Sequence, residues 1–197
     1  VILHDVGISC RRIVNGLKEL HIDMSQVEGI FISHEHSDHI AGLQQLLKRF
    51  DLPVYTKKGT WREIQNKLIV PKHQLVELTK GSLSLGNLTV EPFSGSHDAA
   101  DPIGINVFAG KDKATVVTDT GVITDTILRC LDDTTLLVLE ANYDPHMLRF
   151  GPYLPFLKQR VTSDEGHLSN EMAAQALLMM KRPDFMQVIL AHRSENN

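Results

Sequence analysis

The run Ser33–His39 (Ser-His-Glu-His-Ser-Asp-His) places three imidazoles and two carboxylates within six residues. It directly follows the apolar stretch Ile30–Ile32, which is typical of a buried strand. Imidazole nitrogens and carboxylate oxygens are the ligands that zinc, manganese and iron accept. Short histidine-rich tracts mostly mark metal sites, so we favour metal binding over a solvated loop.

The spacing inside the cluster divides its ligands between two positions. His34 and His36 alternate, so they share one side of an extended chain. Asp38 and His39 are neighbours and must point apart. One tetrahedral site needs only four side chains, whereas two metals about 3.5–4 Å apart need further ligands and usually a bridging carboxylate.

Three later residues can complete such a ligand set. His97, Asp119 and His192 each follow an apolar or β-branched run that we expect to be a strand. Polar side chains just beyond the carboxyl ends of strands gather at the rim of a sheet, where ligands bind. We therefore expect these residues to meet the histidine cluster at such a rim.

Length and composition set bounds on the protein. A chain of 197 residues fits one domain, here 1–197, and 42% hydrophobic with 22% charged residues is ordinary globular composition. The net charge of −4 argues against a broadly basic nucleic-acid-binding surface. No apolar run is long enough to span a bilayer, so we expect no membrane partner. Cys10 and Cys130 lie in helix-like stretches, and we expect them to be buried thiols that pack rather than form a disulfide. Reduced thiols fit a cytoplasmic setting.

Helical and strand patterns alternate along the chain. Expected helices are 10–20, 40–50, 61–69, 123–131, 144–151, 153–161 and 169–181. Expected strands are 1–3, 29–32, 54–56, 135–139 and 185–191, with hairpins over 83–92 and 105–118. Hairpins mixed with helices indicate an α/β fold of two sheets, each covered outside by helices. The start within a strand and the stop soon after His192 suggest a piece trimmed at both ends.

The cluster His34-x-His36-x-Asp38-His39, followed by the three later ligands, resembles the metallo-β-lactamase superfamily. The resemblance implies a four-layer αββα sandwich with a two-metal site, holding zinc or manganese, at one edge. It implies that a first metal is bound by His34, His36 and His97. It implies that a second metal is bound by Asp38, His39 and His192. It further implies that Asp119 bridges the ions and that Asp5 orients ligands from behind.

Two further segments point to nucleic acid. Leu139–Asn142 and Glu165–Asn170 resemble segments of the transfer-RNA 3′-processing nucleases of this superfamily. Carried over, Glu140 would orient His167, which would contact the scissile phosphate or protonate the leaving oxygen. The simpler interpretation makes Glu140 a strand-end carboxylate and His167 a helix-start residue. Ser169 is expected to cap the following helix, whose free N–H groups could also bind phosphate.

The strings 33–42, 96–101, 137–142, 156–170 and 191–197 are most similar to the YycJ-like (WalJ) branch of bacterial metallo-β-lactamase-fold hydrolases. This resemblance implies a metal-dependent 5′-to-3′ exonuclease that acts on DNA. The expected mechanism is attack of a metal-bridging hydroxide on phosphorus, with Asp38 or Asp119 able to accept a proton.

A nuclease also needs contacts to the DNA backbone. Lys158 and Arg160 lie close in sequence to His167 and are our candidates, whereas Lys111 and Lys113 are expected to be surface residues. Arg193 stands where the branch usually has leucine, and either phosphate contact or simple solvation would explain it.

Two alternatives to the nuclease stay open. A hydrolase of small esters, thioesters, lactones or cyclic phosphodiesters would share the metal ligands without needing His167 in the same role. A non-catalytic scaffold is disfavoured, because an inert member would be expected to lose ligands. The sequence does not indicate an oligomeric state.

Overall fold

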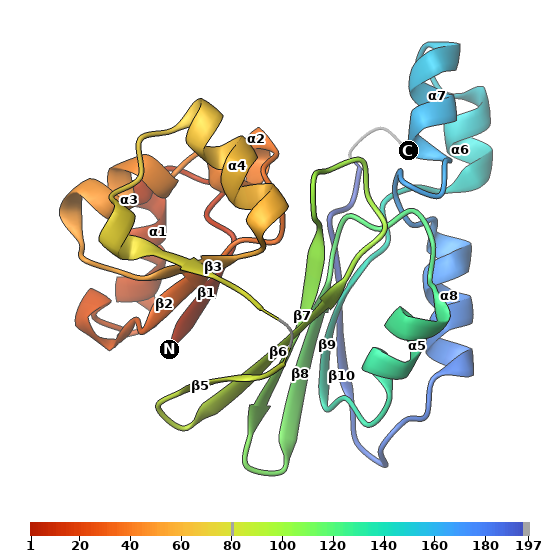
Figure 1. The fold of residues 1–197 in the computed structure, drawn as a ribbon. Helices are drawn as coiled ribbons and strands as arrows, with labels where there is room; N and C mark the ends of the chain where they lie inside the picture. Colours follow the sequence, from red (N-terminus) through yellow and green to blue (C-terminus); the bar gives the residue numbers. More distant parts are fainter. Residues whose placement is uncertain (80, 195–197) are drawn as a thin grey trace. The chain divides into compact units, whose positions relative to one another are not determined.

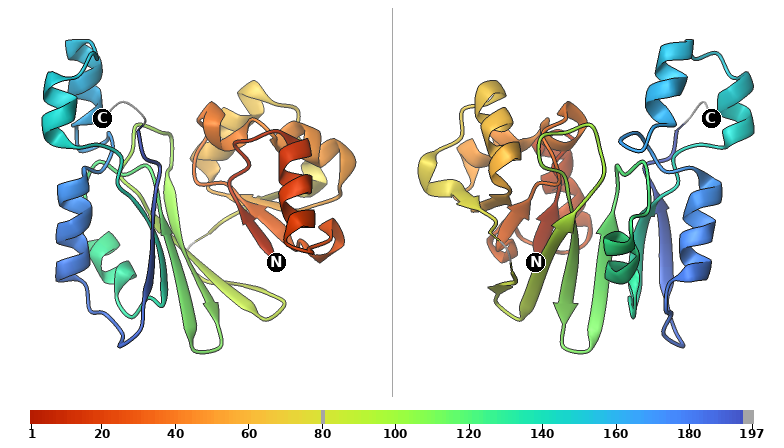
Figure 2. Two further views of the ribbon diagram at one scale, coloured as in Figure 1. Left: turned by 180° about the vertical axis from the view of Figure 1, so that it is seen from behind. Right: turned by 45° about the vertical axis from the view of Figure 1, so that its right-hand side comes forward.

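The computed structural model of the chain describes residues 1–79 and 81–194. The chain divides into two compact units, one of Val1–Lys80 with Ala99–Ile103, the other of Gly81–Asp98 with Gly104–Asn197. Each unit has its own sheet and its own helices (Figures 1 and 2). Among the described residues, no helix has both the length and the apolarity needed to cross a bilayer.

The first unit is built on a parallel sheet in the order β1-β2-β3-β4. Its strands are β1 (Ile2–His4), β2 (Gly29–Phe31), β3 (Val54–Thr56) and β4 (Leu75–Glu77). Its helices are α1 (Cys10–Glu19), α2 (Ser37–Ile40), α3 (Leu43–Arg49) and α4 (Lys58–Lys67). Short 3-10 turns occupy Met24–Gln26 and Lys72–Gln74.

The helices of this unit bury their apolar faces against one side of the sheet. Ile13 and Leu17 of α1 lie one turn apart and are buried, and Ser9 caps that helix by accepting the Arg12 N–H at 3.4 Å. They share a core with Ile30 and Ile32 and with the inner faces of α3 and α4. This packing fixes the segment after β2, where the histidine cluster begins.

The helix expected over 40–50 is α3 in the structure and begins only at Leu43, after Gly42, while α2, which ends at Ile40, was not expected. The Gly42 N–H donates to the Val6 carbonyl at 2.8 Å, and a Cβ at this position would collide with the carbonyls of Val6 and Ile8. Because the chain passes this close to the Val6–Ile8 backbone, the helix restarts there. Strand β4 was not expected from the sequence, although β1 and β3 are equally short and were expected.

The second unit contains a mixed sheet in the order β10-β9-β8-β7-β6-β5. Its strands are β5 (Leu83–Leu85), β6 (Leu88–Ser94), β7 (Ile103–Ala109), β8 (Asp112–Val117), β9 (Leu136–Glu140) and β10 (Gln187–Ala191). The hairpins β5–β6 and β7–β8 are antiparallel, as expected, while β8, β9 and β10 run parallel. Parallel pairing brings the carboxyl ends of these three strands to the same edge.

Helices α5 (Asp125–Leu131) and α8 (Asn170–Met179) cover one face of this sheet (Figure 1). Leu137 and Leu139 of β9 alternate into their shared core, and Ile127 of α5 is fully buried there. Helices α6 (Pro145–Phe150) and α7 (Pro155–Val161) form a separate small cluster with Tyr143. The predicted fold class, two sheets with helices on an α/β chain, is confirmed.

Candidate metal centre and its supporting residues

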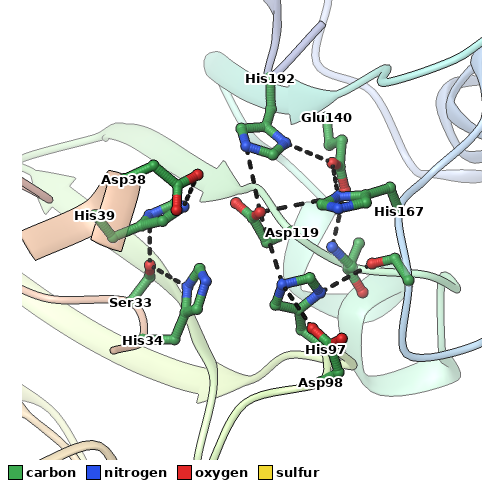
Figure 3. A network of polar contacts seen from close by, with 12 residues as sticks. Ser33, His34, Asp38, His39, His97, Asp98, Asp119, Glu140, His167 and His192 are labelled. Carbon is green, nitrogen blue, oxygen red and sulfur yellow. Dashed lines mark hydrogen bonds and ion pairs between the residues drawn. The ribbon is translucent and has the colours of Figure 1, made fainter. Parts of the chain in front are cut away.

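In the first unit, the cluster leaves β2 and enters the short helix α2 (Figure 3). His34 and His39 are buried, and their ring centroids lie 4.0 Å apart. The ring of His36 meets that of His34 edge-on at 4.5 Å. The Asp38 carboxylate lies 3.5 Å from Nε2 of His39. The tight turn thus gathers the donors that the sequence indicated.

Asp5 holds this cluster from behind. Its Oδ1 accepts the Ser33 N–H and its Oδ2 accepts the Ser33 hydroxyl, both at 2.8 Å. Oδ2 also lies 2.8 Å from Nδ1 of His39, so that nitrogen carries the proton and Nε2 is the ring atom that could bind a metal. Burial opposes ionisation of Asp5, but the charge of His4 and the hydrogen bonds from His39 and Ser33 outweigh it, and the pKa of Asp5 falls below its ordinary value.

In the second unit, Glu140 is a hub of four hydrogen bonds. Its Oε1 lies 2.8 Å from Nδ1 of His167 and 2.9 Å from Nδ1 of His192. Its Oε2 accepts the N–H groups of Thr120 and Leu168 at 2.8 and 3.2 Å. Burial works against the charge of Glu140, but these histidines more than offset it, and the pKa of Glu140 lies below its ordinary value.

The two histidines predicted as ligands in this unit, His97 and His192, converge on Asp119. Oδ1 of Asp119 lies 3.4 Å from Nε2 of His192 and 3.8 Å from Nε2 of His97. Nδ1 of His97 donates to the Gly166 carbonyl at 2.9 Å, which turns Nε2 toward Asp119. Burial lowers the pKa of His97 against the opposing pull of Asp119, so the neutral, metal-binding imidazole is favoured.

The backbone is strained at three of these positions. Asp5, Asp119 and His192 have φ angles of 56°, 53° and 51°, in the left-handed region that non-glycine residues rarely adopt. Each directly follows a strand or lies within two residues of its end. Such conformations cost of order 1–3 kcal/mol and persist where the surroundings fix them, which happens most often at functional sites.

The donor set of each unit fits a divalent metal. Donor atoms around one tetrahedral zinc, each about 2.0–2.1 Å from the ion, lie roughly 3.4 Å from one another. The Asp38–His39 and Asp119–His192 separations of 3.5 and 3.4 Å are close to that spacing. Metal-binding histidines usually fix their second ring nitrogen on an oxygen, as His39, His97 and His192 do here.

The basic residues predicted near His167 have contacts within the chain. Nζ of Lys158 donates to the carbonyls of Arg149 and Gly151, each at 2.8 Å. Nε of Arg160 donates to Oδ2 of Asp98 at 2.6 Å. These bonds fix the two side chains in the α6–α7 region.

Two other polar side chains also have local roles. Ser169 is buried, and its Oγ caps α8 by accepting the Met172 N–H. Lys113, expected to be a surface residue, instead donates to the carbonyls of Cys130 and Asp132 at 2.8 and 2.7 Å, which ties β8 to the end of α5.

Sequence reasoning missed the contact that joins Glu140 to His192. It also missed Asn142, whose Nδ2 donates to the His192 carbonyl at 2.7 Å, and Ser33, whose Oγ lies 2.9 Å from Nδ1 of His34. The adjacency of Ser33 to the cluster was a usable signal. No local signal could have paired Glu140 with His192, because that contact depends on the register of β9 against β10.

Comparison with known proteins agrees with this architecture. A family model described as a β-lactamase superfamily domain matches residues 2–192. The exodeoxyribonuclease YycJ of Bacillus anthracis is 35% identical over 198 residues, covering 100% of this chain and 75% of that protein. The exodeoxyribonuclease WalJ of Streptococcus pneumoniae is 32% identical, covering 100% of this chain and 74% of that protein.

Solved structures show the same fold. The metallo-β-lactamase fold protein YhfI from Bacillus subtilis superposes with a TM-score of 0.75 at 19% identity, covering all of this chain and 75% of that one. Human tRNase Z, short form, gives 0.68 at 20% identity, covering 98% and 82%. The chain therefore belongs to the metallo-β-lactamase-fold superfamily of metal-dependent hydrolases, in the branch that contains YycJ and WalJ.

Proposed function

We propose that this chain is a two-metal phosphodiesterase that degrades DNA from the 5′ end toward the 3′ end. Two relatives above 30% identity, matched over the whole of this chain and both named exodeoxyribonuclease, support a DNA substrate. The observation that carries the proposal is the Glu140–His167 pair, joined at 2.8 Å and located beside the candidate ligand Asp119. A phosphodiesterase needs such a proton donor for its leaving oxygen.

The residues that the superfamily pattern assigns would hold the two metals. One set would be His34, His36 and His97, the other Asp38, His39 and His192, and Asp119 would serve both sets. Zinc fits the histidine content, and manganese is the competitor because of the carboxylates. When bound, the ions supply positive charge for the phosphate oxygens and lower the pKa of water.

His167 has the geometry of a proton donor. Its Nδ1 is held by Glu140, a carboxylate whose pKa lies below its ordinary value, so Glu140 is ionised at neutral pH. Nε2 is then the atom that contacts the phosphate or gives its proton to the leaving oxygen. The side chain of His167 is 20% exposed, against 0% for Glu140, so the histidine can be reached from solvent while its partner cannot.

The remaining substrate contacts belong to the same proposal. Arg160 offers N–H groups outside its bond to Asp98. At the start of α8, the Asn170 and Met172 N–H groups already donate to the Tyr143 carbonyl and to Oγ of Ser169, so the phosphate contact expected there stays a prediction. If two or three cations contact phosphates, DNA affinity should fall steeply with salt. The predicted cytoplasmic setting and single domain over 1–197 stay predictions.

The test is degradation of 5′-phosphorylated single- and double-stranded DNA in Mn²⁺ or Zn²⁺. We expect stepwise release of nucleotides from the 5′ end and no activity in Asp119→Ala. His167→Ala should retain bound metal yet lose about 10²- to 10⁴-fold in kcat, the usual contribution of a general acid. Absence of DNA cleavage by folded, metal-loaded protein would refute the nuclease and favour small esters or cyclic phosphodiesters as substrates.

A further inference from the structure

A pocket of about 420 Å³ opens beside His167 within the second unit. One part of its wall is the metal centre itself. The other part comes from Tyr153, Leu157 and Arg160, in and before α7, and from Arg193, after β10. Neither metal binding nor the Glu140–His167 pair explains why these four side chains face one cavity.

The apolar side of the pocket is ordered before any ligand arrives. Tyr153 and Leu157 are half-buried and pack against Tyr143, Leu148 and Val161, which form the small core under α6 and α7. An aromatic ring fixed in this way offers a flat surface at little entropic cost on binding. Nucleic-acid bases stack on such rings irrespective of sequence.

The polar side of the pocket is cationic. Arg160 uses Nε for its 2.6 Å bond to Asp98, which fixes the guanidinium while the four N–H groups on its two Nη atoms lie outside that bond. Arg193 is exposed and lines the same cavity. Guanidinium groups bind phosphate oxygens in a bidentate manner. The cavity therefore joins an aromatic wall to a phosphate-binding wall.

We propose that this pocket takes one unpaired nucleotide of the DNA strand, with its base on Tyr153 and Leu157 and its phosphate at Arg160 and Arg193. The inference rests on the proposed nuclease function. The pocket volume lies in the range of roughly 300–1,000 Å³ that small-molecule pockets occupy, and a base that stacks on Tyr153 has left the stack of its own duplex. The enzyme should therefore prefer single-stranded or frayed ends to blunt, fully paired ends.

The deciding experiment couples a change in the protein to a change in the DNA. Wild type and Tyr153→Ala are each assayed on single strands that carry either a normal or an abasic nucleotide at each position next to the cleaved bond. We expect Tyr153→Ala on a normal strand, and an abasic nucleotide at one position with the wild type, each to lower kcat/KM about tenfold. The variant acting on the abasic strand should lose no more than either change causes alone. Equal cleavage of normal and abasic strands by wild type, or multiplicative losses, would overturn the pocket assignment.

Matched variants separate stacking from folding. Tyr153→Phe keeps the ring and should restore wild-type kinetics, while Tyr153→Leu keeps the apolar packing and should behave like Tyr153→Ala. Phe156→Ala removes an exposed aromatic side chain that does not line the cavity and should change nothing. A Tyr153→Leu variant as active as wild type would show that the ring acts only in packing.

A direct binding measurement keeps the pocket testable if DNA is not the substrate. Calorimetry with a deoxynucleoside monophosphate should show binding to the metal-loaded wild type and at least tenfold weaker binding to Tyr153→Leu and to Arg193→Ala. Nucleotide binding without DNA cleavage would refute the nuclease and keep the pocket. Cleavage of DNA without nucleotide binding would refute the pocket assignment and keep the nuclease.

Discussion

The two units meet the same chemical requirement in opposite ways. In the first, Ser33–His39 supplies four donors from one turn, and Asp5 holds them from behind. In the second, His97, Asp119 and His192 are spread over nearly half the chain and are collected by the ends of β6, β8 and β10. Glu140 holds side chains of the second unit by hydrogen bonds, as Asp5 does in the first unit.

The difference lies in what each carboxylate holds. Asp5 bonds one ligand histidine and the turn that carries the others. Glu140 bonds one ligand histidine and also His167, the proposed proton donor. On the proposed function, Glu140 therefore supports both metal binding and proton transfer, whereas Asp5 supports metal binding alone. The following predictions test that contrast.

The largest effects are expected from glycines that the ligand segments approach closely. A Cβ at Gly7 would overlap the Asp38 carbonyl, and a Cβ at Gly166 would overlap the carbonyls of Arg160 and Val161. Gly7→Ala should therefore displace ligands of the first unit, and Gly166→Ala should displace His97 and His167. We expect each variant to lose more than about a hundredfold in activity. This loss exceeds the roughly 10- to 100-fold loss that follows removal of one hydrogen-bond partner of a metal ligand.

Gly16→Ala is the matched control for these glycines. No heavy atom lies within 4 Å of a Cβ at Gly16, which is inside helix α1. This variant should keep full activity and gain about 0.5–1 kcal/mol in the free energy of unfolding. Full metal content and activity in Gly7→Ala or Gly166→Ala, measured beside it, would contradict the close approach.

Glu140→Gln should impair both functions of the second unit. The amide can accept from only one side, so it cannot satisfy the four donors that now meet the carboxylate. We expect metal affinity to fall about 10- to 100-fold, and kcat to stay reduced even at saturating metal. Recovery of kcat by excess metal would show that Glu140 acts through His192 alone.

Asp5→Asn should impair metal binding only. We expect about tenfold weaker metal affinity, at the low end of the cost of losing a supporting partner, with kcat restored at saturating metal. A persistent loss of kcat would mean that the two carboxylates have equivalent roles. Metal titrations followed by activity, run in parallel for Glu140→Gln and Asp5→Asn, make this comparison directly.

The stabilisation that Asp5 gives to the wild-type protein should depend on pH. Because the folded-state pKa of Asp5 is lowered, its ionisation stabilises the native state at neutral pH, and this stabilisation is lost as the pH falls below the ordinary value of 3.8. The difference in unfolding free energy between wild type and Asp5→Asn, measured by urea unfolding without metal, should therefore shrink with acidification. A difference that stays constant from pH 7 to pH 3 would contradict the lowered pKa.

The smallest effect is expected at Lys113, which is away from the centre. Lys113→Met leaves the carbonyls of Cys130 and Asp132 without their donor and should cost about 1–3 kcal/mol of unfolding free energy. Its kcat should equal that of wild type. A change in kcat would show that the end of α5 influences the site.

The sequence alone determined the elements and one ligand loop. Helix and strand periods, together with the hairpin pattern over 83–92, placed most elements within a few residues, because burial of an alternating or 3.6-residue pattern is a local property. The His34–His39 cluster could also be recognised from the sequence, because a single turn after β2 gathers its donors. Superfamily resemblance then supplied the order of the later ligands.

Tertiary structure alone decided how the second unit is connected. Ala191 pairs with Glu140 across β10 and β9, and this register brings His192 to the carboxylate that also holds His167. The gathering of Tyr153 and Arg193 around one cavity likewise joins segments forty residues apart. Local patterns cannot encode such contacts, because strand register and helix packing are set by the whole core, and a shift of one residue would turn every side chain to the opposite face.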